Sequence, residues 1–114
     1  MTYINLTPHR VTLVLDGGER VVNIPPTGDI ARIEFEPAGH AMLPGDVPVR
    51  RLAPGKVEGL PEPKEGTFYI VSLVVAQQAA RADVLAPDTA RAVRDEQGRV
   101  IGVPGFISFG KEAQ

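Results

Sequence analysis

Proline and glycine recur so closely along this chain that they limit the length of any helix it can form. The 114 residues include 12 glycines and 11 prolines, which is below the roughly 25–30% typical of low-complexity disorder. Only residues 76–82 are rich in good helix formers. The pattern therefore predicts one mainly β domain over residues 1–114, a small antiparallel barrel or sandwich with one short helix. The choice between barrel and sandwich stays open.

Several segments carry strand patterns. Residues 10–15 and 19–24 flank Asp16-Gly17-Gly18, which predicts a hairpin because glycine supplies the positive φ angles of such turns. Residues 29–36 alternate apolar and charged side chains, as in a strand with one face in water. Residues 67–75 predict a central strand buried on both faces. Further strands are expected at residues 90–94 and 99–103, as a second hairpin, and at residues 106–109.

Residues 37–66 hold six prolines and five glycines, and we predict a long Pro/Gly-rich loop here. Only residues 47–52 are expected to form a short edge strand, because proline cannot donate to a central ladder. Long irregular segments are often binding loops or lids, although a disordered insertion stays open. The segment carries apolar residues that favour packing against the domain: Met42, Leu43, Val47, Val49, Leu52, Val57 and Leu60.

Composition excludes several classes of function. The net charge is −2 and no basic block exists, which argues against general nucleic-acid binding. The absence of cysteine excludes disulfides, thiolate nucleophiles and Cys-ligated metal sites. The longest apolar run is too short to span a bilayer, and the first residues lack signal-peptide features, so we expect a soluble, cytoplasmic protein without a membrane partner. Scarce asparagine is compatible with a thermophilic source, and a GC-rich genome would bias composition similarly.

Several motifs together resemble one family. Residues 5–9 read Asn-Leu-Thr-Pro-His, residues 28–32 Gly-x-x-Ala-Arg, and residues 60–63 Leu-Pro-x-Pro. Residues 70–76 (Ile-Val-Ser-x-x-Val-Ala), 81–87 (Arg-x-Asp-Val-x-x-Pro) and 94–98 (Arg-Asp-x-x-Gly) follow in order. The chain resembles a family of small uncharacterised proteins of phage, prophage and bacterial genomes. The resemblance implies association with phage or mobile elements. The family often has a cysteine where this chain has Val103, so no thiol chemistry is carried over.

The strongest candidate for a binding site is a group of charged residues after the predicted central strand. Arg81, Asp83, Arg94 and Asp95, with Arg91 and Arg99 nearby, include guanidinium groups that can clamp a carboxylate or phosphate. Asp83 would hold Arg81 in place. In the alternative interpretation, Arg81 and Asp83 close a turn, and Arg94 and Arg99 solvate a hairpin that Asp95 caps.

His9 and His40 are the only histidines, and they are weak candidates for a two-histidine, one-carboxylate metal site with Asp29 or Asp46. No His-Glu-x-x-His spacing supports that site, so we expect no metal and no cofactor. The alternative makes His9 a strand-start residue whose ring hydrogen-bonds the Thr7-Pro8 turn, and His40 a solvated loop residue. No catalytic residue is predicted either: Ser72 lacks a nucleophile elbow, and no P-loop or dinucleotide motif occurs.

Three functional hypotheses remain, and a non-enzymatic module is favoured over an enzyme. The first is a phage-type or mobile-element module that binds a small ligand or partner, with an anionic nucleotide-like or carboxylate ligand at the arginines. The second is a structural subunit that acts through homo-oligomerisation. The third is a metal-dependent hydrolase built on His9 and His40. Self-association is expected because a small domain supplies limited cover for a central strand and for open sheet edges.

Overall fold

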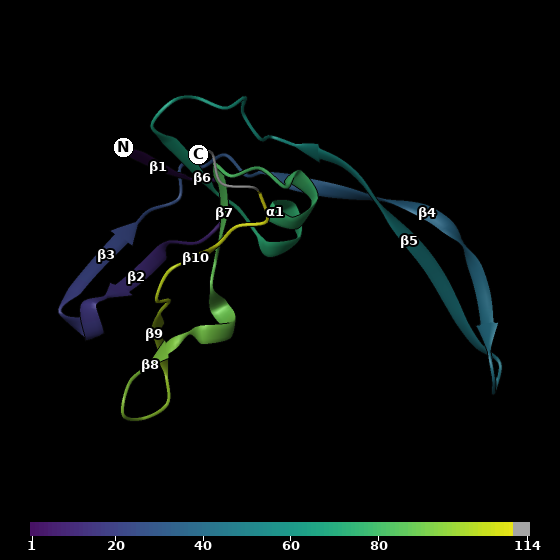
Figure 1. Cartoon of the computed structure of the whole chain (residues 1–114). Coiled ribbons are helices and arrows are strands. Elements are labelled where there is room, and N and C mark those ends of the chain that lie inside the picture. The colour runs from purple at the N-terminus through teal and green to yellow at the C-terminus, as the bar shows by residue number, and fades with distance from the viewer. Residues whose placement is uncertain (111–114) are drawn as a thin grey trace.

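The computed structural model describes residues 1–110 (Figure 1). Its strands are β1 (Thr2–Asn5), β2 (Val11–Leu15), β3 (Arg20–Ile24), β4 (Arg32–Leu43), β5 (Val47–Glu58), β6 (Thr67–Ile70), β7 (Val84–Pro87), β8 (Val93–Arg94), β9 (Val100–Gly102) and β10 (Phe106–Ile107). One α-helix, α1 (Leu73–Ala79), and two short 3₁₀ turns, η1 (Asp16–Gly18) and η2 (Thr89–Arg91), complete the elements of residues 1–110.

The described part of the molecule outside β4 and β5 is here called the body. Its centre is a four-stranded mixed sheet with the order β1-β6-β7-β10. β1 pairs parallel with β6, β6 pairs parallel with β7, and β10 runs antiparallel to β7. Parallel neighbours need a crossover connection, and α1 supplies it between β6 and β7. This mixed sheet corrects the prediction of a purely antiparallel architecture.

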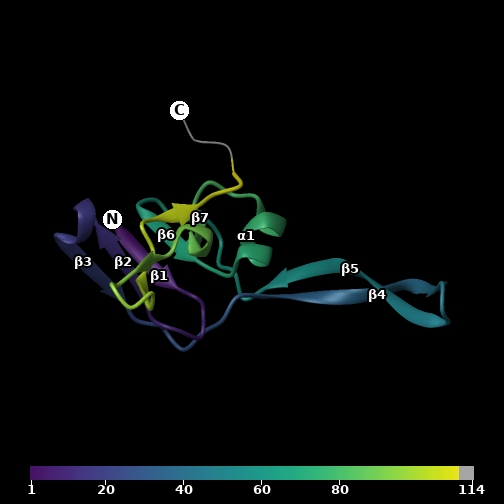
Figure 2. The same ribbon diagram turned by 90° about the horizontal axis from the view of Figure 1, so that it is seen from below.

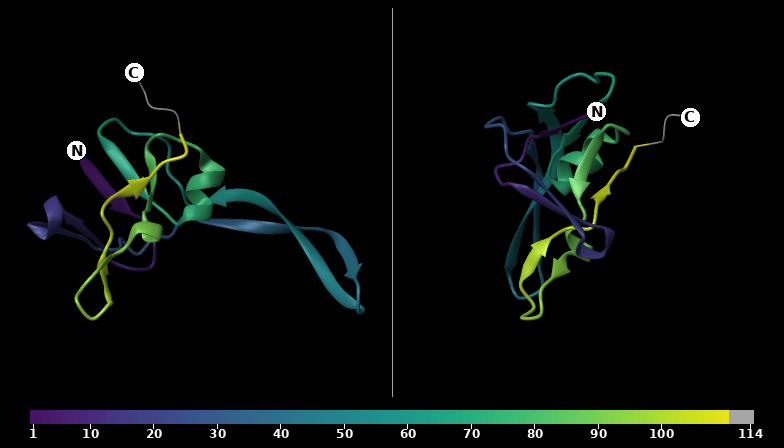
Figure 3. Two further views of the ribbon diagram at one scale, coloured as in Figure 1. Left: turned by 60° about the horizontal axis from the view of Figure 1, so that its bottom comes forward. Right: turned by 90° about the vertical axis from the view of Figure 1, so that its left-hand side faces the viewer.

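The two faces of this sheet carry separate parts of the core. Because side chains alternate along a strand, Tyr69 and Val71 face one side, where they pack with Val75 of α1. Ile70 faces the other side and packs with Leu13 and Val103. The helix and the β2–β3 hairpin therefore cover opposite faces of the sheet, as the turned views show (Figures 2 and 3).

Strands β4 and β5 form a long antiparallel ribbon, here called the arm, that leaves the body (Figures 1 and 3). Twelve residues per strand correspond to about 40 Å at about 3.3 Å per residue. The radius of gyration is 17.2 Å, against about 13 Å for a compact domain of this length. Only the base of the arm joins the core, through Ile33 and Val57.

The arm overturns the prediction of a loop over residues 37–66. Residues 37–43 and 47–58 belong to strands, and the predicted edge strand at residues 47–52 is one part of β5. The ribbon tolerates proline because every second N–H of a two-stranded ribbon points away from the partner strand, so proline at such a position removes no hydrogen bond of the pair. Pro37, Pro48 and Pro54 occupy such a ribbon, opposite Leu52, Met42 and Phe35 respectively.

The predicted strand at residues 67–75 is also too long, since β6 ends at Ile70 and α1 begins at Leu73, three residues before the predicted helix. A buried β-branched run has the same appearance in a strand and in a buried helix. β1 and β7 were not predicted. Both hairpins and the strand near residue 106 are confirmed. The structure is mainly β, no sheet within residues 1–110 closes into a barrel, and the arrangement is consistent with a sandwich-like fold.

Candidate functional site

Arg81 and Asp83 form a bidentate ion pair just before β7. Arg81 Nε donates to Asp83 Oδ1 at 3.0 Å, and Nη2 donates to Oδ2 at 2.6 Å. This hydrogen bonding holds the pKa of Asp83 below its usual range and raises that of Arg81, against the opposing effect of desolvation. The remaining guanidinium nitrogen of Arg81, Nη1, donates to the carbonyl of Pro61 at 3.1 Å.

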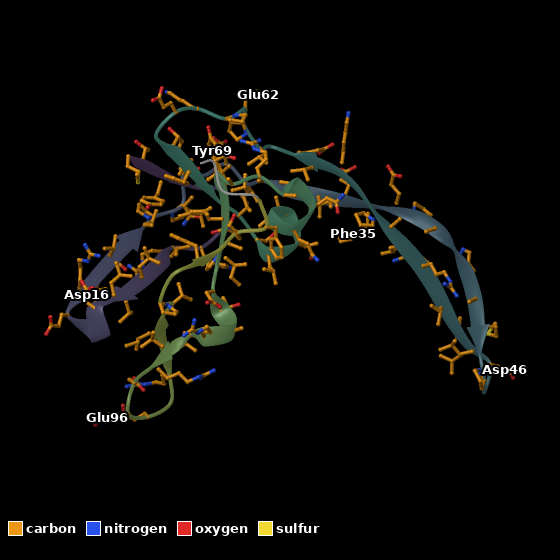
Figure 4. All side chains as sticks on the ribbon, in the orientation of Figure 1. Asp16, Phe35, Asp46, Glu62, Tyr69 and Glu96 are labelled. Atoms are coloured by element: carbon orange, nitrogen blue, oxygen red, sulfur yellow. The ribbon has the colours of Figure 1, made fainter. Side chains whose placement is uncertain are left out.

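The same pair helps to position the segment that returns from the arm. Beside the Arg81–Pro61 bond, the hydroxyl of Tyr69 donates to the carbonyl of Glu62 at 3.2 Å. Figure 4 shows Tyr69 in the body and Glu62 above it. Two side chains of the body thus hold consecutive carbonyls of the chain that follows β5, so Arg81 acts as a structural anchor in this chain.

Arg94 and Asp95 lie elsewhere, in the β8–β9 hairpin beyond the other end of β7 (Figure 1). Arg94 Nη1 donates to the carbonyl of Gly98 at 2.7 Å. Asp95 accepts from the backbone N–H groups of Gln97 and Arg99, both at 2.9 Å, and from Arg99 Nε at 3.0 Å. Asp95 therefore caps the hairpin turn, as the alternative interpretation expected. The structure does not bring the two charged groups together, and their role in ligand binding stays a prediction.

The two histidines are also far from each other. His40 lies on β4, opposite Arg50 on the arm, whereas His9 lies in a turn of the body. The chain described, residues 1–110, contains no cluster of three metal-ligating side chains. The expected hydrogen bond from the His9 ring is not what holds the turn either. The carbonyl of His9 accepts from Asn5 Nδ2 and Thr7 Oγ1 instead.

Sequence analysis missed Asn5, which is fully buried and organises this turn. Its Nδ2 donates to the carbonyls of His9 at 2.8 Å and Ile24 at 3.0 Å. Its Oδ1 accepts from the N–H and the hydroxyl of Thr7 at 3.0 and 2.7 Å. The available signal was the Asn-Leu-Thr-Pro-His motif, in which an asparagine and a threonine two residues later are typical of a side-chain-closed turn.

Beneath that turn lies a hollow of about 500 Å³, here called the carboxyl-end hollow. It lies where β6 and β7 end, and the crevice at the carboxyl ends of parallel strands is a common place for binding. The lining is largely apolar and includes Pro8, Val71, Leu73, Ile101 and Val103. His9, Arg10 and Ser72 also line it. Such a hollow suits apolar groups with one polar or anionic contact near them.

The arm is the other surface that lacks cover. Phe35, which is 50% exposed, lies near its base, and Met42, 66% exposed, lies near its end. Leu43, Val47 and Leu52 are exposed as well. Cross-strand pairing puts Phe35, Met42 and Leu52 on one face, and Leu43 and Val47 on the other. The arm therefore presents apolar side chains on both faces, which is unusual for a ribbon that stays in water.

The comparisons with known proteins do not add a relative. No family model, no curated protein and no solved structure matches the chain. The resemblance to the phage and prophage family accordingly stays a prediction from its motifs. Within residues 1–110, no helix is long and apolar enough to cross a membrane.

Proposed function

We propose that this protein is an interaction subunit that assembles with other copies of itself through the β4–β5 arm. The observation that carries the proposal is the exposure of large apolar side chains on both faces of a ribbon that joins the body only at its base. Membership of a phage or mobile-element system remains part of the proposal and rests on the sequence motifs alone.

The physical argument starts from the weakness of a two-stranded ribbon. An isolated hairpin is marginally stable in water, and independent stability requires further strands or packing against a helix. Here α1 and the core cover only the base, around Ile33 and Val57. A partner that buries the distal part removes apolar surface from water, at roughly 25 cal/mol per Å². The arm thus gains stability from the contact that it provides.

The edges of the arm limit how a partner can bind. Proline lacks the N–H that strand addition requires, and Pro37 in β4 and Pro48 and Pro54 in β5 interrupt both edges. Pairing of a further strand along either edge is therefore disfavoured. Side chains on the faces and at the tip are the groups left to make the contact.

The test is an arm-shortened variant in which residues 37–52 are replaced by Asn-Gly. Glu36 and Ala53 face each other in the ribbon, so a two-residue turn can close the hairpin between them. The base, with Ile33 and Val57, remains intact. We expect the full chain to sediment as an oligomer at about 50 μM, a concentration that detects contacts of about micromolar strength. The shortened variant should sediment as a folded monomer.

Two results would contradict the proposal. One is a full-length chain that sediments only as a monomer at this concentration. The other is a shortened variant that keeps the oligomeric mass of the full chain. Circular dichroism and thermal melting of both proteins establish that the shortened variant is folded. A variant with Glu19→Gln, in the exposed β2–β3 turn, serves as a control that should not change the assembly.

A further inference from the structure

The tip of the arm and the carboxyl-end hollow are both largely apolar, and they carry side chains of opposite charge, Asp46 on the tip and Arg10 in the hollow. The arm tip, defined as residues 42–48, carries Met42 and Pro48 on one face and Leu43 and Val47 on the other. Between them the chain turns through Gly45 and Asp46, whose φ angles are 84° and 60°. The tip is therefore a narrow, apolar projection that ends in a tight turn with one carboxylate, Asp46.

The hollow offers an apolar surface of comparable character. Leu73 is 50% exposed and Ile101 is 46% exposed, although both line the same hollow as the buried Val71. A second, smaller hollow of about 280 Å³ lies beside it and shares the Thr7, Pro8 and Ser72 ridge. The two hollows together extend the apolar surface from Ile101 to the base of the arm, so the surface has room for more than one inserted side chain.

Charge makes the match specific. Arg10 lines the carboxyl-end hollow and forms no ion pair within the part of the chain that the structure describes. Asp46 is exposed at the tip and is likewise without an ion-pair partner among residues 1–110. A tip inserted in the hollow brings an unpaired carboxylate towards an unpaired guanidinium, beside contacts that are otherwise apolar. Such anchoring of apolar side chains in a pocket is typical of the groups that dominate interface energies.

The arm cannot make this contact within one molecule. Figure 4 shows Asp46 at the far end of the arm, well away from the body, and the longest dimension of the molecule is 54 Å. β4 and β5 are paired from base to tip, with register shifts only at Ile33/Phe35 and Pro37/His40, so the arm would have to unpair in order to fold back. The complementary surfaces therefore have to meet between two copies.

We propose that the arm tip of one copy docks in the carboxyl-end hollow of the next copy, with Asp46 paired to Arg10. This inference rests on the proposed function and names the surfaces through which it acts. Tip and hollow are different surfaces, and each copy has one of each. Docking therefore produces a two-fold dimer that exchanges its tips, a larger closed ring or an open filament.

The first experiment uses two variants that each disable one surface. Leu43→Glu places a charge on the tip, and Leu73→Glu places one in the hollow. Both side chains are about half exposed, and an acidic residue is favourable at the first position of a helix, so both variants should fold. Each variant alone should sediment as a monomer. An equimolar mixture should form dimers and nothing larger, because it holds only one intact tip and one intact hollow per pair.

The second experiment reverses the charges. Asp46→Arg and Arg10→Asp should each weaken assembly at least tenfold, since each places like charges together. The double variant should recover assembly to within a few-fold of the natural chain. The matched control is Val21→Glu, an exposed apolar residue of β3 outside both surfaces, which should leave assembly unchanged.

A cross-linking experiment reads the same contact directly, because the chain contains no cysteine. Mixing Leu43→Cys protein with Leu73→Cys protein should produce a disulfide-linked heterodimer faster than mixing Leu43→Cys with Val21→Cys. Equal rates would overturn the inference.

The outcomes separate this inference from the proposed function. A natural chain that is monomeric refutes both. A natural chain that assembles, loses assembly when the arm is shortened, and keeps it in the Leu43→Glu and Leu73→Glu variants refutes only the docking of tip in hollow. Loss of assembly in Leu43→Glu together with normal assembly of Leu73→Glu also overturns it, because the tip then binds another surface or another protein.

Discussion

Replacing Asn5 with alanine should destabilise the protein more than the small size of the change indicates. The side chain is fully buried and makes four hydrogen bonds, and no buried side-chain nitrogen or oxygen within residues 1–110 lacks a partner. The Thr7 hydroxyl has one proton and lies 2.7 Å from Asn5 Oδ1 and 3.0 Å from the carbonyl of His9, so in the alanine variant this proton can go to the carbonyl. The carbonyl of Ile24 and the N–H of Thr7 lose the partner that Asn5 provides.

Each buried polar group left without a partner costs about 1–3 kcal/mol. The buried bond to Ile24 and the partly buried bond to Thr7 together predict a loss of about 3 kcal/mol in the free energy of unfolding. That is a large fraction of the roughly 5–15 kcal/mol typical of a domain. The loss should lower the melting temperature by about 10 °C, at about 4 °C per kcal/mol for a domain of this length. Urea denaturation followed by circular dichroism at 25 °C measures the difference in free energy.

The matched control is the other asparagine of the chain. Asn23 is exposed and its side chain takes part in one hydrogen bond, accepting from the Thr12 hydroxyl at 2.8 Å. Asn23→Ala should change the free energy of unfolding by less than about 0.5 kcal/mol, as is usual for surface positions. If the two alanine variants lose the same stability within about 0.5 kcal/mol, the reasoning from buried hydrogen bonds is refuted.

Three further predictions concern other parts of the body. Asp83→Asn should lower the free energy of unfolding at neutral pH by about 1 kcal/mol, as expected for a partly exposed ion pair. Because the pKa of Asp83 is depressed in the folded state, the natural chain should lose this contribution as the pH falls from about 4 through that pKa, and the variant should show no such loss. In urea denaturation, Gly59→Ala should lower the free energy of unfolding more than Gly28→Ala does. Both residues have positive φ, but only at Gly59 would a Cβ meet a backbone oxygen, that of Ile30, at 2.7 Å. Equal losses of free energy in the two variants would contradict this. Arg94→Ala should leave the melting temperature nearly unchanged, since its one side-chain bond is exposed, and an anion that stabilises the natural chain but not this variant would support the ligand role of Arg94.

The elements that could be predicted from the sequence are those set by neighbouring residues. Asp16, Gly17 and Gly18 all have positive φ between β2 and β3, and Asp95 caps the turn that ends at Gly98. Such turns require particular residues at particular positions, so a few residues are sufficient to reveal a hairpin. The ion pair of Arg81 with Asp83 belongs to the same class, because its partners are two residues apart.

The arm and the central sheet depended on tertiary structure. Nothing in residues 37–66 distinguishes a prolonged ribbon from a proline-rich loop, because proline is excluded only from central ladders and not from outward positions of a pair. β7 is short, and it becomes a strand because β6 on one side and β10 on the other satisfy its backbone groups. Pairing between distant segments is decided by the whole fold.

The same division, between what the sequence determines and what the tertiary structure decides, applies to function and to the candidate binding surfaces. Composition alone excluded thiol chemistry and disfavoured general nucleic-acid binding, because those functions require residue types or charge blocks that the chain lacks. The carboxyl-end hollow could not be foreseen, since its wall joins residues 7–12, 71–73, 87–89 and 100–103. Local turn geometry is a property of adjacent dihedral angles, so a short stretch of sequence determines it. The hollow between four separate segments exists only after parallel pairing has brought the ends of β6 and β7 beside the turn that Asn5 closes.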